Sequence, residues 1–260
     1  MEKFLQDIIK EAGFLAKGYY QQEISHTFKS DPTDILTVAD TAVESFLINK
    51  ILERYPDHGI ISEEREDPIN PEAEYVWVID PIDGTRNFSR HIAMWCTMVG
   101  ITKKGKPYMG AVYDAVNDEL FFAKKGKGAF LNNNKIHVSK HADVKHSFLV
   151  FSGGVMNQDS PYNAGEFERY AKFHDKLVAE DGHWIHNFGT TMSLCALAAG
   201  RVDAMIMNSG LYHDYLANYV IATEAGALFT DSHGNDWKKG RMDVVVANST
   251  LHKNLMAMFN

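Results

Sequence analysis

The strongest chemical signal in this sequence is a pair of aspartates held in one tight turn. A β-rich run that begins at Tyr75 ends at Asp80. Pro81 and Gly84 then force a turn that points Asp83 the same way. Two carboxylates this close repel one another unless a divalent cation lies between them. Because oxygen ligands suit Mg²⁺, which keeps several waters and bridges to phosphate groups, the spacing predicts a magnesium site.

The same turn offers a place for an anion. We expect Asp83 to lie near the N-cap of a short helix, which leaves the backbone amides of Gly84 and Thr85 facing outward. Free amides at the start of a helix bind phosphate oxygens well. Taken alone, however, both Asp-Pro and Asp-Gly are ordinary turn dipeptides, so the turn needs support from elsewhere in the chain.

Further acidic residues stand at the ends of other predicted elements. Glu63 follows a short β-rich run, Asp40 follows Thr37 near the start of a predicted helix, and Asp214 begins another. Each alone is commonly a helix cap or a solvated charge. Five acids at element ends, one of them beside an anion-binding turn, are better explained by a site for several metal ions.

Hydrophobic spacing predicts the elements that must position these acids. Helices are predicted over 4–19, 38–54, 166–178, 190–199 and 214–225, and strands over 60–62, 75–80, 148–151, 201–207 and 244–246. Between 95 and 138, short strands separated by turn residues predict an antiparallel meander. An eight-fold βα barrel is disfavoured, because the meander interrupts the βα alternation.

We therefore expect an α+β fold, a layered sandwich of helices and sheets forming one domain over residues 1–260. Its first half, 1–145, is predicted to hold the meander sheet, and its second half, 146–260, a mixed α/β arrangement. At 260 residues, with 45% hydrophobic and 12% aromatic residues, the chain can bury a substantial core, which excludes disorder as its main state.

Charge limits the partners of the protein. Lys and Arg number 26 and Asp and Glu 34, so the formal net charge is −8. This sign disfavours a nucleic-acid partner, which is bound through phosphate neutralisation. The same charge opposes a small phosphate ester as well, unless metal ions reverse the sign locally.

Two features bear on location. Cys96 and Cys195 lie among apolar neighbours and are expected to be buried, reduced thiols. The first ten residues alternate charged and apolar side chains as a helix does, unlike a signal peptide, and no apolar run approaches the roughly 20 residues of a membrane span. We therefore expect a cytoplasmic protein without a membrane partner.

Four blocks of this chain, in the same order and spacing, resemble the inositol monophosphatase family: 34–40, 61–64, 80–88 and 213–226. The resemblance covers nearly the whole chain and includes the meander segment 125–130. It implies a layered αβαβα sandwich and a homodimer. It also implies a Mg²⁺-dependent, lithium-sensitive phosphomonoesterase that hydrolyses inositol monophosphate to inositol and phosphate.

The resemblance also implies a set of metal ligands for two or three Mg²⁺ ions. Glu63, Asp80 and the carbonyl of Ile82 would hold the first ion, and Asp80, Asp83 and Asp214 the second. A third, weaker ion would be held by Glu63 and waters.

The same resemblance implies which residues act on the attacking water and which bind the substrate. Thr85 and Asp40, with Glu63 at the third ion, would orient and deprotonate the attacking water. The substrate would be bound by the amides of Gly84 and Thr85, by Asp83 and Asp214, and by Lys29 in a loop that closes over the site.

The chain departs from the family pattern at two positions. His213 replaces the Trp that usually precedes the last metal aspartate, and either packs there or contacts a metal or the substrate. Met207 stands seven residues before Asp214, where inositol phosphatases carry a glutamate that contacts inositol hydroxyls. A thioether is a weak hydrogen-bond acceptor.

Because of Met207, other phosphate esters are alternative substrates for the same metal site. They are the 2′-phosphate of NADP(H), or another sugar phosphate such as fructose-1,6-bisphosphate. A more distant alternative is a non-catalytic, metal-dependent interaction protein.

Overall fold

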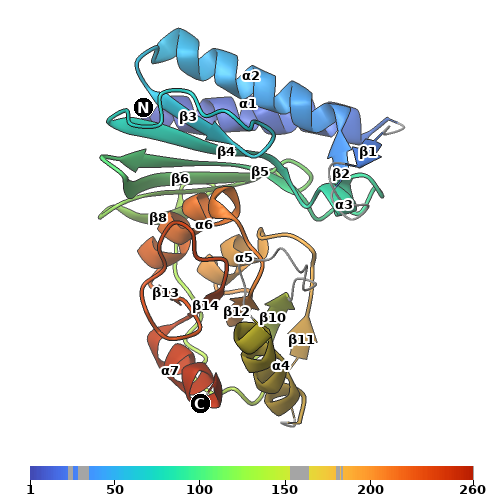
Figure 1. Ribbon diagram of the computed structural model, residues 1–260, viewed down its shortest axis with the longest axis vertical. Coiled ribbons are helices and arrows are strands. Elements are labelled where there is room, and N and C mark those ends of the chain that lie inside the picture. Colours follow the sequence, from blue (N-terminus) through green and yellow to red (C-terminus); the bar gives the residue numbers. More distant parts are fainter. Residues whose placement is uncertain (23–25, 29–34, 153–163, 180–181, 183, 260) are drawn as a thin grey trace.

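Helices and sheets alternate through the molecule in five layers (Figure 1). The computed structural model describes residues 1–22, 26–28, 35–152, 164–179, 182 and 184–259. Four apolar cores fill the spaces between successive layers. The order helix, sheet, helix, sheet, helix confirms the predicted αβαβα sandwich.

The first layer consists of the two N-terminal helices, α1 (Glu2–Tyr20) and α2 (Val38–Arg54). Both match their predicted positions. In α1 the buried residues recur at helical spacing, as at Leu5, Ile9 and Ala16, so one stripe of the helix faces the neighbouring sheet. Helix α2 starts at a capping box in which the side chain of Thr37 accepts hydrogen bonds from the first-turn amides.

The second layer is a seven-stranded sheet with strand order β3-β4-β5-β6-β7-β8-β9. Its strands are β3 (Gly59–Ser62), β4 (Tyr75–Asp83), β5 (Cys96–Lys103), β6 (Lys106–Asp114), β7 (Glu119–Lys124), β8 (Gly128–Leu131) and β9 (Asn134–Ile136). Strands β3 and β4 are parallel and every later pair is antiparallel, which confirms the meander. A separate two-stranded sheet joins β1 (His26–Phe28) to β2 (Ile35–Thr37).

Strand β4 extends beyond its predicted end. The register shifts between Asp80 and Asp83, and Asp83 still pairs with Cys96 of β5. The short helix α3 (Thr85–Phe88) follows directly. This irregularity bends the strand end, as a bulge does, and places both aspartates at the margin of the sheet.

The middle layer holds α5 (Ser193–Ala198) and α6 (Tyr212–Glu224), between the two sheets. Helix α6 lies so close to the seven-stranded sheet that a Cβ at Gly100 would come within 2.7 Å of Leu216 Cγ. The carboxylate of Glu224 accepts hydrogen bonds from the amides of Gly126 and Gly128, at 2.7 and 2.8 Å. These contacts hold α6 against the meander along its whole length.

The fourth and fifth layers come from the second half of the chain. The five-stranded sheet has the order β11-β10-β12-β14-β13, with strands β10 (Phe148–Ser152), β11 (Trp184–His186), β12 (Ala204–Met207), β13 (Leu228–Thr230) and β14 (Val244–Ala247). Parallel and antiparallel pairs both occur, as the mixed prediction requires. Helices α4 (Ala164–Ala179) and α7 (Ser249–Phe259) cover its outer face. None of the described helices is long and apolar enough to cross a membrane.

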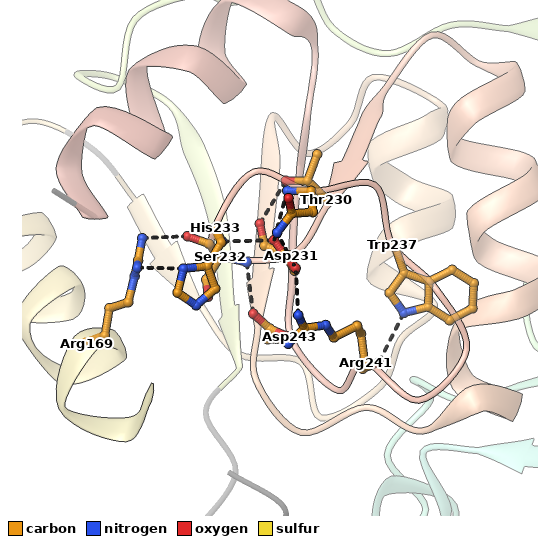
Figure 2. A network of polar contacts seen from close by, with 9 residues as sticks. Arg169, Thr230, Asp231, Ser232, His233, Trp237, Arg241 and Asp243 are labelled. Carbon is orange, nitrogen blue, oxygen red and sulfur yellow. Dashed lines mark hydrogen bonds and ion pairs between the residues drawn. The ribbon is translucent and has the colours of Figure 1, made fainter. Parts of the chain in front are cut away.

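A polar network fixes the loop between β13 and β14 (Figure 2). Arg169 of α4 donates to the carbonyl of Ser232 at 2.7 Å and contacts Nδ1 of His233 at 3.0 Å. The buried carboxylates of Asp231 and Asp243 accept hydrogen bonds from backbone amides of the same loop. These two acids therefore stabilise a turn.

Candidate metal centre

Three of the predicted site residues meet where the end of β4 faces the start of α6. Asp80, Asp83 and Asp214 each contribute a carboxylate oxygen, and these oxygens all lie within 4.8 Å of one another. Asp80 is 1% exposed and Asp83 6% exposed, whereas Asp214 is half-buried. The seven-stranded sheet supplies two of the acids and the middle helix layer supplies the third.

Repulsion and burial dominate the electrostatics of Asp80. Burial raises the pKa of Asp80 well above its usual range, and the carboxylates of Glu63, Asp83 and Asp214 raise it further. Glu63 also shares a side-chain hydrogen bond with Asp80, so it adjoins the cluster as a fourth acid. Oδ1 of Asp80 is buried without a hydrogen-bond partner among the residues that the structure describes.

This donor set fits a divalent cation. All the side-chain donors are carboxylate oxygens, which are the ligands that Mg²⁺ prefers. A cation would supply the missing partner of Asp80 Oδ1 and offset the repulsion among the acids.

Asp83 is anchored by the turn that leads into α5. Its carboxylate accepts hydrogen bonds from the Thr190 hydroxyl and from the backbone amides of Thr191 and Met192, the latter two at 3.1 and 3.2 Å. The thiol of Cys96 lies 3.6 Å from Oδ2. Burial raises the pKa of Asp83, and the hydrogen bonds from Thr190, Thr191 and Met192 oppose that rise.

Asp83 lies next to the N-cap of a short helix, as expected. Gly84, with a φ of +86°, is the N-cap of α3. Asp83 remains paired in the sheet, and its side chain is turned toward the amides that precede α5. The same contact explains why α5 begins at Ser193 instead of 190, since the three residues before it form a turn around this carboxylate.

The remaining predicted residues of the turn adjoin the cluster. The Thr85 hydroxyl donates to the carbonyl of Ile82 at 2.9 Å, so the predicted water-orienting group contacts the predicted carbonyl ligand. Gly84 is tightly enclosed: a Cβ there would lie 2.9 Å from the Met94 carbonyl oxygen and 3.2 Å from Thr190 Cβ. Only glycine fits this position, because it also has a positive φ.

Of the last two predicted residues, the structure describes Asp40 but not Lys29. Asp40 is completely buried in the first turn of α2, where the backbone N–H and hydroxyl of Thr37 donate to it at 2.8 and 2.5 Å. It is not one of the three clustered acids, and its role as a base stays a prediction. Lys29 lies outside the described residues.

The two departures from the family pattern lie at the end of β12 and at the start of α6. Met207 is the half-buried last residue of β12, and its carbonyl accepts a hydrogen bond from the Tyr170 hydroxyl at 3.2 Å. His213 is half-buried in the first turn of α6, directly before Asp214. Cys96 and Cys195 are buried free thiols, as predicted, and burial raises the pKa of both.

The sequence alone did not identify the groups that hold Asp83. Thr190 and Thr191 were assigned only to a helix, and Asn218 received no role. A signal was present: Asn218 follows Asp214 by one helical turn and lies between apolar residues of α6. A polar side chain on the buried face of a helix requires a partner.

Metal-free protein is expected to lose stability as pH rises. The pKa values of Asp80 and Asp83 are raised in the folded state, so between the ordinary and the raised pKa the folded state binds more protons than the unfolded state. The protonated carboxyls stabilise the folded protein fully below their ordinary, unfolded-state pKa. This stabilisation is lost as pH rises through their raised, folded-state pKa. Mg²⁺ is expected to restore stability at the upper end, where the ligands are ionised.

Urea unfolding with EDTA or Mg²⁺, between about pH 4 and about pH 8, tests this expectation. Asp80→Asn serves as the control, because it removes the most strongly perturbed group and should flatten the EDTA profile. An equally steep profile in this variant would exclude Asp80 as its source.

Comparison with known proteins supports one family over the whole chain. The inositol monophosphatase family model matches residues 1–260. Human inositol monophosphatase 1 is 32% identical over 252 residues, which is 94% of this chain and 88% of the human protein. The Nus factor SuhB of Salmonella typhimurium is 28% identical over 249 residues, covering 95% of this chain and 91% of that protein.

A solved structure has the same fold. The crystal structure of the extragenic suppressor protein SuhB from Bartonella henselae matches with a TM-score of 0.89 at 25% identity, covering 99% of this chain and 97% of that chain. The family is one of Mg²⁺-using phosphomonoesterases, although some relatives carry the name of a Nus factor. The chain belongs to the inositol monophosphatase family.

Proposed function

We propose that this protein is a Mg²⁺-dependent phosphomonoesterase that hydrolyses inositol monophosphate to inositol and phosphate. The observation that carries the proposal is the cluster of buried Asp80 and Asp83 with half-buried Asp214, which Glu63 adjoins. The similarity to human inositol monophosphatase 1, which spans nearly both chains, supports the choice of substrate. Family membership also supports a homodimer, lithium inhibition and a cytoplasmic location as parts of this proposal.

The proposal assigns the acids to two or three Mg²⁺ ions. Asp80, Asp83 and Asp214 would hold them together with Glu63 and the carbonyl of Ile82. When bound, such ions supply an activated water and neutralise the charge that develops on the phosphate and the leaving oxygen. In this assignment Asp80 would be a ligand of both of the first two ions, because the carboxylates of Glu63, Asp83 and Asp214 all act on it.

Other groups of this chain would accept the proton of the attacking water and bind the phosphate of the substrate. Thr85 donates its hydroxyl hydrogen to Ile82, which leaves its oxygen able to accept a hydrogen bond from the attacking water. Asp40 then takes the proton of that water, as general base. The amides of Gly84 and Thr85 would bind the phosphate, and Lys29, by family resemblance, would add a positive charge to it.

A substrate panel tests the activity. Phosphate release is measured from inositol-1-phosphate, NADP and fructose-1,6-bisphosphate, each with Mg²⁺ and with EDTA. We expect the fastest release from inositol-1-phosphate with Mg²⁺, and none in EDTA. An absence of Mg²⁺-dependent release from all three would overturn the enzyme proposal. It would favour the interaction role for which the similarity to a Nus factor gives a precedent.

Met207 supports a second candidate on the same site, a phosphatase of NADP(H) or of another sugar phosphate. Its thioether at the end of β12 is a weak acceptor for an inositol hydroxyl. We expect Met207→Glu to raise kcat/KM for inositol-1-phosphate relative to NADP by about tenfold, since a hydrogen bond to a charged group contributes about 1.5–3 kcal/mol. The measurement is kcat/KM for inositol-1-phosphate and for NADP, determined on the same preparation of each protein.

Met207→Leu is the matched control for this substitution. It preserves an apolar side chain of similar volume, and its ratio of efficiencies should equal that of the unaltered protein. If Met207→Glu also leaves the ratio unchanged, this position does not contact the sugar.

A further inference from the structure

Asn218 is a polar residue that is buried in an otherwise apolar part of the middle layer. It lies one turn after Asp214 on α6, and its side chain is completely buried. Its Nδ2 donates to the Asp214 carbonyl at 2.9 Å and to Thr191 Oγ1 at 3.1 Å, with Met98 Sδ 3.7 Å away. Its Oδ1 accepts from the Cys195 thiol at 3.3 Å. Both ends of the amide therefore have partners, which gives it a single orientation.

Thr191 connects this amide to Asp83. The backbone N–H of Thr191 donates to Asp83 Oδ1 at 3.1 Å, and its hydroxyl accepts from Asn218. Thr191 thus contacts Asn218 through its side chain and Asp83 through its backbone. This chain of contacts joins α6 to β4 through the turn before α5.

Stability alone does not account for an asparagine at this position. Its neighbours in the core include Met98, Ala217 and Ile221 on the facing strand and the same helix. Burying an amide among apolar groups costs free energy that a leucine of similar volume does not lose. Asparagine is also a weaker helix former than leucine.

The contacts from Asn218 through Thr191 join two carboxylates that repel each other. The oxygens of Asp83 and Asp214 lie within 4.8 Å, so without a cation their charges tend to separate the end of β4 from the start of α6. Asn218 bonds to the backbone of Asp214 and, through Thr191, to the carboxylate of Asp83. It therefore opposes that separation.

We propose that Asn218 is a positioning residue of the metal centre, which holds Asp83 and Asp214 at the spacing that Mg²⁺ requires. The inference rests on the proposed function only in taking Mg²⁺ as the ion that these two acids bind. Groups that orient metal ligands from behind typically contribute about 10- to 100-fold to metal affinity.

The test is Asn218→Leu in the full chain, with Mg²⁺ binding measured by isothermal titration calorimetry. We expect the Kd for Mg²⁺ to rise by on the order of tenfold. In the same variant, the urea midpoint of the metal-free protein should be unchanged or higher, because a buried amide has been replaced by an apolar group. A purely structural asparagine would instead lower the midpoint and leave the Kd for Mg²⁺ unchanged.

Two further variants keep the proposal open to refutation. Thr191→Val removes the connecting hydroxyl and should weaken Mg²⁺ binding by a similar factor. The double variant should be no weaker, because both residues belong to one chain of contacts. Thr223→Val is the matched control: its hydroxyl donates to the Tyr219 carbonyl within α6, at 2.6 Å, so Mg²⁺ affinity should not change.

Unchanged Mg²⁺ affinity in both Asn218→Leu and Thr191→Val would overturn the proposal, as would a loss of affinity accompanied by equal destabilisation of the metal-free protein. Unaltered protein that binds Mg²⁺ without releasing phosphate would overturn only the proposed function. Unaltered protein that binds no Mg²⁺ would overturn both.

Discussion

Asp80→Asn is expected to reduce Mg²⁺-dependent phosphate release by on the order of 10³-fold while increasing the stability of the metal-free protein. Asp80 is buried and its carboxylate faces three other acids, all of which raise its pKa. An amide of the same shape removes a charge from this group. It therefore relieves repulsion in the metal-free site and removes a ligand from the metal-bound one. The two effects have opposite signs, and no general loss of folding produces both.

Phosphate release and urea unfolding in EDTA measure the two effects of Asp80→Asn. Asp231→Asn is the matched control, because Asp231 is equally buried, at 1% exposure, but accepts hydrogen bonds within the network of Figure 2. That control should lose about 1–3 kcal/mol of stability and retain activity. Full activity in Asp80→Asn would remove Asp80 from the metal ligands.

Gly84→Ala is expected to lower kcat by on the order of 10²-fold or more and to destabilise the protein by about 2–4 kcal/mol. A side chain at a φ of +86° is strained, and its Cβ would lie 2.9 Å from the Met94 carbonyl oxygen. The backbone must then move, and it carries Asp83 on one side and Thr85 on the other. Both groups would be displaced from their positions in the site.

Gly240→Ala separates strain from displacement in this experiment. Gly240 has a φ of +91°, and no atom lies within 4 Å of the position that a Cβ would take, so alanine there adds the strain without the overlap. We expect a loss of about 1 kcal/mol and normal kcat. Steady-state kinetics and urea unfolding are compared for both variants. Equal activity in the two would show that the enclosure of Gly84 does not position the site.

Much of the fold could be predicted from local patterns. The boundaries of α2 and the order of the meander strands agree with the sequence, because apolar spacing, caps and turn residues act over a few neighbours. The errors occur where distant segments meet. Strand β4 continues to Asp83 because β5 pairs with it, and α5 begins later than predicted because the three residues before it form a turn around the Asp83 carboxylate.

The sequence by itself determined the acids Asp80 and Asp83 and the turn that carries them, since Pro81 and Gly84 act on adjacent residues. Asp214 was also assigned to the site from the sequence, through the family resemblance, and the structure brings it to the other two acids. Only the tertiary structure decided that Asn218, through Thr191, connects Asp214 to Asp83. Those contacts depend on how α6 packs against the seven-stranded sheet, where glycines permit close approach. Hydrogen bonds between segments far apart in the chain leave no periodic signal, so they become visible only when the layers are assembled.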